Sequence, residues 1–377
     1  MYSIRKVNVF LVILVLLICC LSCSDDKPYK PKQPAIFSLS DKVDYPVGTG
    51  PHSVYACDLD EDGDYDLAVA NMNSNSISIL RGDGLGSFAA AEDHGSSGDR
   101  PMSVIGCDID DDDLNDLVMV SYASDELAIW RNRGGGTYTT AWIFPVGDGP
   151  WAVIPCDLTG DGDNDLVVAN GNSDNISVML YTGSFDRTDY TAGNHPASVC
   201  ASDMNGDGAI DLASANAYSD NVSVFINNGS GTFAPAVHYY TGDGPLSICT
   251  CDLDGDNDND LAVANLNSDS VSVLLNKGDG TFESPVTYGV GDAPGSICAG
   301  DLDGDGDYDL AVANTESDNI SVLLNKGNAT FEDAQYFNVG DAPESIIACD
   351  LDKDGDKDLA VANTDSNNVS VFLNNTK

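Results

Sequence analysis

The stretch Asp301-Leu-Asp-Gly-Asp-Gly-Asp-Tyr-Asp-Leu-Ala-Val-Ala-Asn314 places acidic residues at alternate positions around a glycine and then continues into a short apolar segment. Related stretches occur seven times, and successive copies start 46 to 50 residues apart. The copies begin at Asp58, Asp108, Asp157, Asp203, Asp252, Asp301 and Asp350. A period of this length indicates a repeat architecture, so the fold of one repeat decides the fold of the chain.

Each repeat has the pattern of four short β-strands. In the sixth repeat, residues 296–300 lead into the acidic loop, residues 310–314 follow it, and residues 320–324 and 331–339 complete the unit. These runs are rich in β-branched and aromatic residues, are bounded by Gly, Asn, Asp or Pro, and show no helical periodicity. The sequence therefore predicts a four-stranded antiparallel meander in every repeat.

The two ends of the chain predict how the repeats are assembled. The last repeat stops after a third strand at residues 369–373, whereas residues 36–48 match the fourth-strand pattern. An N-terminal strand that completes the last unit would remove two exposed sheet edges. We therefore predict an all-β fold, a seven-bladed β-propeller over residues 36–377 that is closed by the N-terminal strand.

Three motifs resemble a known family. They are Tyr45-Pro-Val-Gly-Thr-Gly-Pro51, the Asp-x-Asp-x-Asp-Gly-x-x-Asp loop and the Asn-x-Gly-x-Gly-Thr-Phe turn. Together they resemble the FG-GAP (VCBS) repeats of integrin α-subunit propellers and of many bacterial surface proteins. The resemblance covers essentially the whole chain after its N-terminal segment, and it implies a propeller that binds calcium. It implies little about the ligand, because that family includes adhesins, lectins and non-catalytic modules attached to enzymes.

The charge of the chain limits its partners. The formal net charge is -45, from 61 acidic and 16 basic residues, and the acids concentrate in the seven loops. Bound cations would offset their mutual repulsion. Nucleic acids and anionic membrane surfaces are excluded as direct partners, because both require clustered Lys and Arg.

The N-terminus has the pattern of an export signal. Arg5 and Lys6 precede an apolar run at residues 9–21, which is too short to span a bilayer as a helix. We expect a lipoprotein-type signal peptide at residues 1–22 and a flexible tether at residues 23–35.

Cys23 is the expected lipidation site, because the segment resembles a bacterial lipoprotein signal, with Cys19 and Cys20 as alternatives. The acidic pair Asp25-Asp26 resembles the surface-export tag of lipoproteins in some Gram-negative bacteria. The expected location is the extracellular side of the cell surface or outer membrane, with a lipid anchor as the only link to the membrane.

The cysteines allow two interpretations. Of the 11 cysteines, three lie in the signal region. The other eight each stand one or three residues before the first Asp of a loop: Cys57, Cys107, Cys156, Cys200, Cys249, Cys251, Cys298 and Cys349. Disulfides are one interpretation, but equivalent positions on different sheets are usually too far apart. We favour the other, in which they are small buried packing residues.

The acidic loop has the ligand pattern of a calcium site. Side chains at loop positions 1, 3, 5 and 9 can converge on one ion, with the carbonyl of position 7 as a further ligand, and position 6 favours glycine because the chain bends there. Without an ion, each close carboxylate pair would cost about 4 kcal/mol at an effective dielectric constant of about 20. We expect up to seven structural Ca²⁺ ions.

The candidate ligands occupy positions 1, 3, 5, 7 and 9 of the loops. In the first four loops they are Asp58, Asp60, Asp62, Asp64, Asp66; Asp108, Asp110, Asp112, Asp116; Asp157, Thr159, Asp161, Asp163, Asp165; and Asp203, Asn205, Asp207, Ala209, Asp211. In the last three they are Asp252, Asp254, Asp256, Asp258, Asp260; Asp301, Asp303, Asp305, Asp307, Asp309; and Asp350, Asp352, Asp354, Asp356, Asp358.

The seven loops are not expected to bind equally well. Thr159 and Asn205 replace an acid at position 3, and Asp113 stands where position 6 should be glycine, so the second loop should be the weakest or empty. We expect the strongest binding in the loops that begin at Asp58, Asp252, Asp301 and Asp350.

The face opposite the calcium loops is the expected ligand-binding surface. A proline stands in each segment that leads from one repeat to the next, which we call a crossover. The residue after this crossover proline varies among the repeats: His52, Met102, Trp151, Ala197, Leu246, Gly295 and Glu344. The larger apolar and aromatic choices cluster in repeats 1 to 4, beside tyrosines in the facing loops. The candidate ligand-binding residues are His52, Met102, Tyr122, Trp151 and Tyr218. They could bind a glycan or an extended peptide, or they could simply cover the mouth of the channel.

The sequence gives little support for catalysis. It has no Gly-x-Ser-x-Gly, His-Glu-x-x-His or Gly-Lys-Ser/Thr motif, and its four histidines lack paired metal-ligand spacing. We expect a monomeric, non-catalytic, calcium-dependent binding or adhesion module outside the cell that recognises a protein or a glycan. The alternative is a polysaccharide-acting lyase or hydrolase, or the accessory lectin domain of one.

Overall fold

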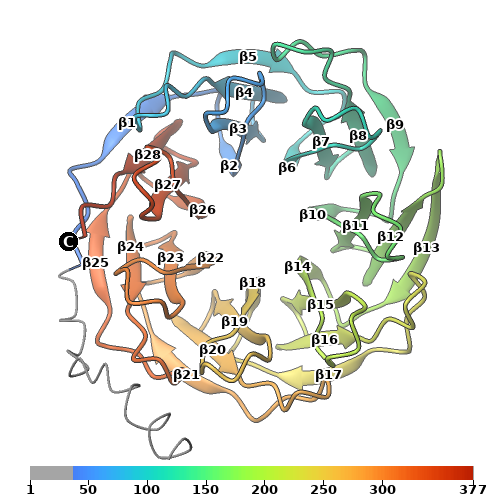
Figure 1. The fold of residues 1–377 in the computed structure, drawn as a ribbon, viewed down its shortest axis with the longest axis vertical. Helices are drawn as coiled ribbons and strands as arrows, with labels where there is room; N and C mark the ends of the chain where they lie inside the picture. The colour runs from blue at the N-terminus through green and yellow to red at the C-terminus, as the bar shows by residue number, and fades with distance from the viewer. Residues whose placement is uncertain (1–36, 377) are drawn as a thin grey trace, which may run out of the picture. The chain divides into compact units, whose positions relative to one another are not determined.

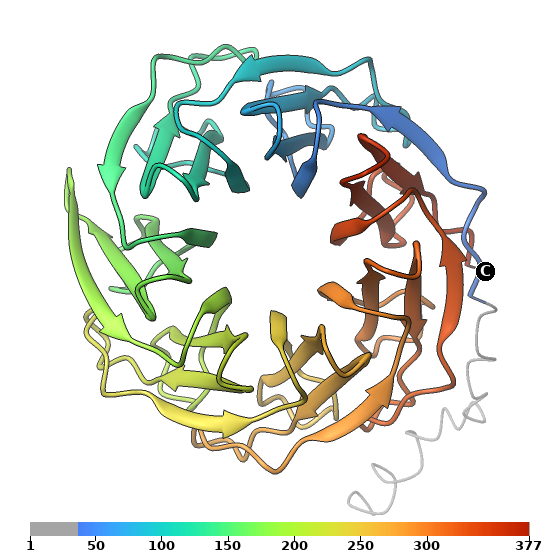
Figure 2. The ribbon, with the colours of Figure 1, turned by 180° about the vertical axis from the view of Figure 1, so that it is seen from behind.

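The computed structural model describes residues 37–376, which fall within one compact unit. Seven four-stranded antiparallel sheets stand around a central axis like the blades of a propeller (Figure 1), and the reverse view shows the same ring (Figure 2). Nothing in this part of the chain is a helix with the length and hydropathy needed to span a membrane. The predicted signal peptide, the tether and Cys23 lie outside the described residues.

The strands repeat in the same order in every blade. The first strands, nearest the axis, are β2 (Pro51–Cys57), β6 (Pro101–Cys107), β10 (Pro150–Cys156), β14 (Pro196–Ser202), β18 (Pro245–Cys251), β22 (Pro294–Gly300) and β26 (Pro343–Cys349). The second strands are β3 (Asp66–Asn71), β7 (Asp116–Ser121), β11 (Asp165–Asn170), β15 (Asp211–Asn216), β19 (Asp260–Asn265), β23 (Asp309–Asn314) and β27 (Asp358–Asn363).

The third strands are β4 (Ser76–Leu80), β8 (Glu126–Trp130), β12 (Asn175–Tyr181), β16 (Asn221–Phe225), β20 (Ser270–Leu274), β24 (Asn319–Leu323) and β28 (Asn368–Phe372). The fourth strands, on the circumference, are β5 (Glu92–Gly95), β9 (Trp142–Pro145), β13 (Phe185–Thr191), β17 (Val237–Tyr240), β21 (Val286–Gly289), β25 (Gln335–Asn338) and β1 (Val43–Pro46). Most fourth strands are shorter than predicted. In the sixth blade, Phe331 forms only an isolated bridge before β25 begins.

The ring closes as the sequence predicted. The last sheet has the order β1-β28-β27-β26, so its outer strand comes from the N-terminal side of the chain. β1 pairs with β28 in antiparallel register from Val43↔Val371 to Pro46↔Asn368, and Leu39 forms a further bridge to Asn374. This pairing covers the edge that β28 would otherwise expose.

The hydrophobic core lies between neighbouring blades. All six residues of every second strand are buried. In β23, Leu310 and Val312 pack toward the fifth blade, whereas Ala311 and Ala313 pack toward the seventh. Because successive side chains of a strand point to opposite faces, large residues from one blade meet small residues from the next. This alternation lets the twisted sheets pack closely around the axis.

The eight described cysteines are all unpaired and are buried or partly buried. Burial raises the pKa of Cys57 and Cys200 to about 12, so these thiols remain protonated at neutral pH. The interpretation as packing residues is confirmed for this part of the chain.

Candidate functional site

The ring has two faces built from different connections. The first, which we call the loop face, carries the acidic loops and the Asn-x-Gly turns, and Asn132 Nδ2 joins the two by donating to Leu59 O of the neighbouring blade (2.9 Å). The second, the crossover face, carries the segments that pass from one blade to the next and the turns between second and third strands. The backbone N–H of Met72 donates to Gly50 O there (2.7 Å).

The acidic loops share one hydrogen-bonded frame. In all seven, the position 1 carboxylate accepts the N–H of position 6, and the position 5 carboxylate accepts the N–H of position 7. Position 6 adopts a left-handed φ in every loop, between 64° and 100°, which explains the predicted preference for glycine. Asp113 adopts φ 64° and keeps the same bend. The backbone of the second loop is therefore regular, and the prediction that this loop binds calcium weakly or not at all stays a prediction.

Position 9 is a buried aspartate that begins the second strand. Asp309 is completely buried and accepts the N–H groups of Leu302 (2.8 Å) and Asn325 (2.7 Å). The equivalent aspartates of the other six blades make the same pair of bonds. Burial raises the pKa of Asp309 to about 7. A nearby cation would favour the ionised form.

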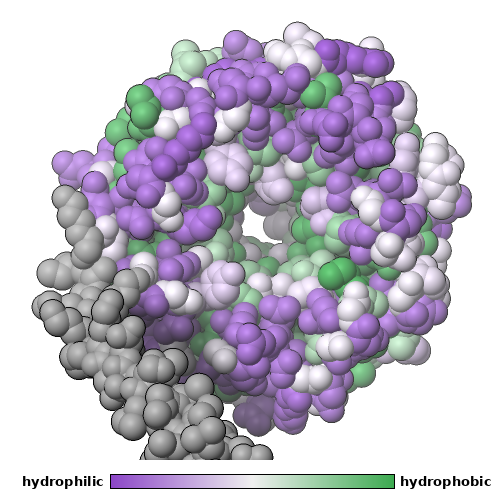
Figure 3. Space-filling model, in the orientation of Figure 1, coloured by the Kyte–Doolittle hydropathy of each residue, from purple (hydrophilic) through white to green (hydrophobic). Residues whose placement is uncertain are grey.

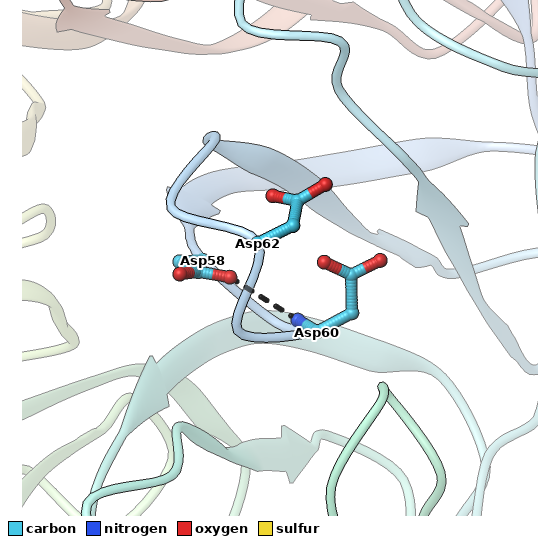
Figure 4. A group of neighbouring side chains, drawn as sticks. All are labelled: Asp58, Asp60 and Asp62. Atoms are coloured by element: carbon cyan, nitrogen blue, oxygen red, sulfur yellow. Dashed lines mark hydrogen bonds between the residues drawn. The ribbon is translucent and has the colours of Figure 1, made fainter.

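Five loops bring three carboxylates together, with oxygen atoms within 4.8 Å of one another. In the first loop the group consists of Asp58, Asp60 and Asp62 (Figure 4), so positions 1, 3 and 5 meet. In the other four, positions 1, 3 and 9 meet: Asp108, Asp110 and Asp116; Asp252, Asp254 and Asp260; Asp301, Asp303 and Asp309; Asp350, Asp352 and Asp358. The predicted convergence of positions 1, 3, 5 and 9 is thus only partly reproduced, since position 5 joins the group in the first loop alone and position 9 joins it in the other four.

The remaining candidate ligands lie differently. In the third and fourth loops Thr159 and Asn205 replace a carboxylate, and Asn205 Oδ1 accepts the N–H of Asp207 (2.9 Å). None of the three-carboxylate groups found among residues 37–376 includes a position 7 side chain. Asp64, at position 7 of the first loop, instead pairs with Lys353 of the neighbouring loop.

The residues present fit a cation in the last three loops. Asp301 Oδ1 and Asp350 Oδ1 are shielded from solvent and have no hydrogen-bond partner. Unpaired buried carboxylate oxygens are costly, and a hard cation with oxygen ligands would satisfy them. In the described part of the chain, no Lys or Arg forms an ion pair with the three-carboxylate groups that begin at Asp252, Asp301 and Asp350.

The first two loops already contain a cation supplied by the chain itself. Arg81 follows β4, and its Nη1 lies 3.3 Å from Asp66 Oδ2 and 3.5 Å from Asp60 Oδ2. Arg131 follows β8 and pairs with Asp110 in the second loop. The equivalent residues in the other blades are uncharged: Leu180, Ile226, Leu275, Leu324 and Leu373. The loop at Asp58, expected to be among the strongest calcium sites, therefore has a competing guanidinium.

On the crossover face, the residues after the crossover prolines surround the mouth of the channel. All seven line one cavity of about 120 Å³, together with the residue that follows each of them. Figure 3, in the orientation of Figure 1, looks at the opposite face of the ring and shows the central opening, with more hydrophobic surface around it than on most of the rim. The varied residues noted in the sequence therefore share one site.

The aromatic residues of this face form a connected cluster. The Trp151 ring centroid lies 5.7 Å from that of His52, 6.1 Å from Tyr122 and 5.3 Å from His195. His195 stacks on Tyr218, with centroids 4.3 Å apart and ring planes 13° apart. We call these five residues the mouth cluster. Tyr218 is 74% exposed, so one broad ring face is open to a ligand.

Met102 contributes little accessible surface to this cavity. Its exposure is 3%, and its backbone carbonyl accepts a hydrogen bond from His52 Nδ1 (2.9 Å). Burial, the largest influence, lowers the pKa of His52, so its ring favours the neutral form. Met102 thus holds the His52 ring in place, which differs from the ligand contact predicted from the sequence.

Three residues of this site were not predicted. His195 adopts φ 57° at a crossover position that is glycine in three other blades, and Arg100 lies over the Tyr122 ring at 5.1 Å. A Cβ atom on Gly171 would lie 2.6 Å from His195 Cε1 and 2.9 Å from Trp151 Cδ1. A residue larger than glycine at position 171 would therefore displace both rings. The glycine-to-histidine change was the sequence signal that could have identified His195.

Glu344 lies in the wall of the same mouth. Burial raises its pKa from 4.5 to about 7, with a smaller contribution from Asp365. The mouth therefore contains a carboxyl group with a pKa near neutral pH. The His52 ring lines the same cavity.

The repeats identify the family. Six overlapping segments match the FG-GAP-like repeat: residues 58–119, 108–168, 157–214, 203–263, 252–312 and 301–361. The chain belongs to the FG-GAP-like repeat family. Comparison of its sequence with curated proteins finds no significant match.

Solved structures with the same ring are distant in sequence. BBS1N in complex with ARL6DN has a TM-score of 0.66 at 14% identity, covering 90% of this chain and 97% of that one. A streptogramin B lyase has a TM-score of 0.64 at 15% identity, with coverage of 90% and 98%. An Agrocybe aegerita lectin that recognises non-reducing terminal N-acetylglucosamine has a TM-score of 0.53 at 19% identity, with coverage of 76% and 80%. At these identities the likeness extends to the fold alone.

The buried aspartate of each FG-GAP repeat should be essential for stability. Replacing Asp309 with Ala leaves two buried N–H groups unpaired, and we expect it to lower the free energy of unfolding by roughly 3–5 kcal/mol. Urea unfolding in the presence of a chelator measures this loss without any metal contribution. Asp305→Ala in the same loop is the matched control, and its cost should stay below about 1 kcal/mol because Asp305 is exposed. Equal losses would contradict the assigned role.

Glu344 should make stability depend on pH. Its folded pKa, about 7, lies above its ordinary value of 4.5, so its contribution to stability is complete below about pH 4.5 and is lost as the pH rises to about 7. Glu344→Gln stays neutral and avoids this loss. The variant should therefore gain stability over the parent across this interval, by roughly 2 kcal/mol at pH 8. Thermal melts at fixed calcium and ionic strength test this, and a pH-independent difference would refute it.

Proposed function

We propose that this protein is an exported, calcium-stabilised binding module that recognises a glycan through its crossover face. The mouth cluster is the observation that carries the proposal, because it brings aromatic and imidazole rings from four blades together around one opening. Aromatic faces bind the apolar face of a sugar ring and leave its hydroxyls free for polar neighbours.

Polar groups stand beside these rings. Asn172 Nδ2 donates to Tyr122 Oη (3.1 Å), and both residues are accessible on the crossover face. A protein partner would use the same surface, but the narrow mouth and its exposed tyrosine suit a chain of sugar rings better than a flat interface. The partner is therefore proposed to be a glycan, with a protein as the competing outcome.

The loop face is proposed to bind Ca²⁺. The residues that would hold it are the three-carboxylate groups beginning at Asp252, Asp301 and Asp350, in which no Lys or Arg of the described chain competes. When bound, the ion supplies the positive charge that buried carboxylates need, and its binding energy adds to the stability of the folded state. These ions would be structural, since the loop face is opposite the mouth cluster.

The structural neighbours support both kinds of partner. The Agrocybe aegerita lectin recognises a sugar, and BBS1N is in complex with the protein ARL6DN. Export, and attachment of the propeller through lipidated Cys23, are further parts of the proposal and rest on the N-terminal sequence.

An enzyme acting on a polysaccharide is the second candidate. It is favoured by one observation, the presence of Glu344 and His52 in the wall of one cavity. Burial raises the pKa of Glu344 and lowers the pKa of His52, so the neutral form of each side chain is favoured. Such groups could exchange protons with a bound substrate near neutral pH. Cleavage of a bound polysaccharide, lost in Glu344→Gln, would favour this candidate.

Calcium should raise the melting temperature and bind to at least three loops. The double variant Arg81→Gln and Arg131→Gln removes the internal cations, so it should bind up to two more ions than the parent in equilibrium dialysis with Ca²⁺. Lys353→Gln is the control, because it removes a charge from the loop face and frees only Asp64, which belongs to none of the three-carboxylate groups. An identical melting temperature in calcium and in chelator would rule out structural calcium.

A glycan array probed in the presence of calcium should identify a ligand. Trp151→Ala and Tyr122→Ala should each weaken binding of that ligand at least tenfold, because both rings belong to the mouth cluster. Trp142→Ala is the control, since Trp142 is 44% exposed on the outer strand β9. Retained binding in both cluster variants would exclude this surface.

A further inference from the structure

Neighbouring blades are joined at the circumference by aromatic pairs. A ring from the fourth strand of one blade packs against a ring that follows the third strand of the next, or, in the last blade, against Phe37, which precedes β1. Six of the seven seams have this contact, with centroids 4.9 to 5.9 Å apart: Tyr45–Phe88, Phe144–Phe185, Tyr190–Phe233, Tyr239–Phe282, Tyr288–Phe331 and Phe337–Phe37. These pairs fill the space between the outer parts of the blades.

The seam between the first and second blades is the exception. His94 of β5 and Tyr138 of the second blade occupy the two positions, and among the described residues they form no ring pair. Trp130, at the end of β8, stands where the first and fifth blades have a fully buried leucine. This seam is therefore built from different residues on both sides.

A pocket of about 660 Å³ opens at this seam. His94 and Gly95 line one side, and Trp130, Tyr138 and Thr139 line the other. A Cβ atom on Gly95 would meet nothing within 4 Å, so the entrance is clear. The volume lies within the range of small-molecule sites. The lining residues come from β5 and just after it, from the end of β8 and the segment after it, and from β9, and Figure 1 shows β5 and β9 as neighbouring strands on the circumference. The pocket shares no residue with the channel mouth formed by the first strands.

The walls of this seam pocket have unused hydrogen-bonding capacity. His94 Nε2, Tyr138 Oη and Thr139 Oγ1 are shielded from solvent and have no partner. At three other seams the tyrosine hydroxyl is paired, as in Tyr288 Oη donating to Ala329 O (2.8 Å). Small side-chain rotations would let these groups bind a ligand's hydroxyls.

The charge of the pocket lining and its aromatic wall indicate which chemical class of ligand the pocket suits. The lining includes the carboxylate of Asp93 but no Lys or Arg, which disfavours an anion. Trp130 Nε1 donates to Ser97 Oγ (2.9 Å), and this bond holds the indole in a fixed orientation. A fixed indole beside several hydroxyl and imidazole groups is suited to a neutral sugar ring.

We propose that the pocket between the first and second blades binds a neutral sugar of one or two rings, at a site independent of the mouth cluster. Trp130 provides the stacking surface, and His94, Tyr138 and Thr139 provide the polar contacts. The second blade thus takes part in ligand binding on the circumference as well as at the channel mouth.

Tryptophan fluorescence can test this site selectively, because the chain has only three tryptophans. In the double variant Trp142→Phe and Trp151→Phe, Trp130 is the sole reporter and the mouth cluster is altered. The probes are methyl glycosides of glucose, galactose and N-acetylglucosamine, together with lactose and cellobiose, with glucuronate as the anionic comparison. We expect a saturable change in emission with at least one neutral sugar, and at least tenfold weaker binding of glucuronate.

Two blocking variants, made in the same background, complete the test. His94→Tyr with Tyr138→Phe restores the aromatic pair of the other seams, and Gly95→Phe fills the entrance. Each should weaken binding of the neutral sugar at least tenfold. The melting temperature of each variant should stay within a few degrees of that of the unblocked background protein. The proposal is overturned if no neutral sugar gives a saturable change, if glucuronate binds equally well, or if a folded blocking variant retains full affinity.

Discussion

The structure depends on one buried carboxylate in each blade. The aspartate that begins every second strand joins the acidic loop to the end of the third strand through two backbone N–H groups, as Asp309 does with Leu302 and Asn325. This bond pair fixes the loop relative to the sheet, but it also buries negative charge beside other carboxylates. The charge must be offset locally, and the loops do so in different ways. In the first two blades Arg81 or Arg131 supplies a cation, whereas the sixth and seventh loops leave Asp301 Oδ1 and Asp350 Oδ1 without either a hydrogen bond or an ion pair to a Lys or Arg of the described residues.

This shared frame lets individual blades diverge. The second blade has Ser121 and Ala128 where most blades pair a buried asparagine with a buried serine, as Asn314 does with Ser321 (2.8 Å). It also carries Arg131 in its acidic loop and Trp130 at the outer seam. Because the neighbouring blades supply regular packing on either side, one irregular blade can be tolerated. Such a blade is where a repeat protein can acquire a specific site.

The two faces of the ring differ in how much their residues vary between blades. On the loop face the same hydrogen bonds recur seven times, so its geometry is insensitive to most substitutions between blades. On the crossover face, the position after each proline points into the channel mouth and varies from Gly295 to Trp151. Its backbone is held by other contacts, such as the N–H of Met72 to Gly50 O. Side chains there can change without loss of the fold, which is the condition for a ligand-binding surface.

The sequence by itself determined the repeat, the four strands of each blade, the closing strand and the glycine bend of the loop, because each follows from residues close together in the chain and recurs seven times. It also located the variable residues of the mouth. Only the tertiary structure showed Arg81 against the Asp58 loop, Met102 beneath the surface, His195 within the mouth cluster and the open seam beside Trp130. These features depend on which side chains meet across a sheet or between blades, often about 50 residues apart, and no local pattern encodes that packing.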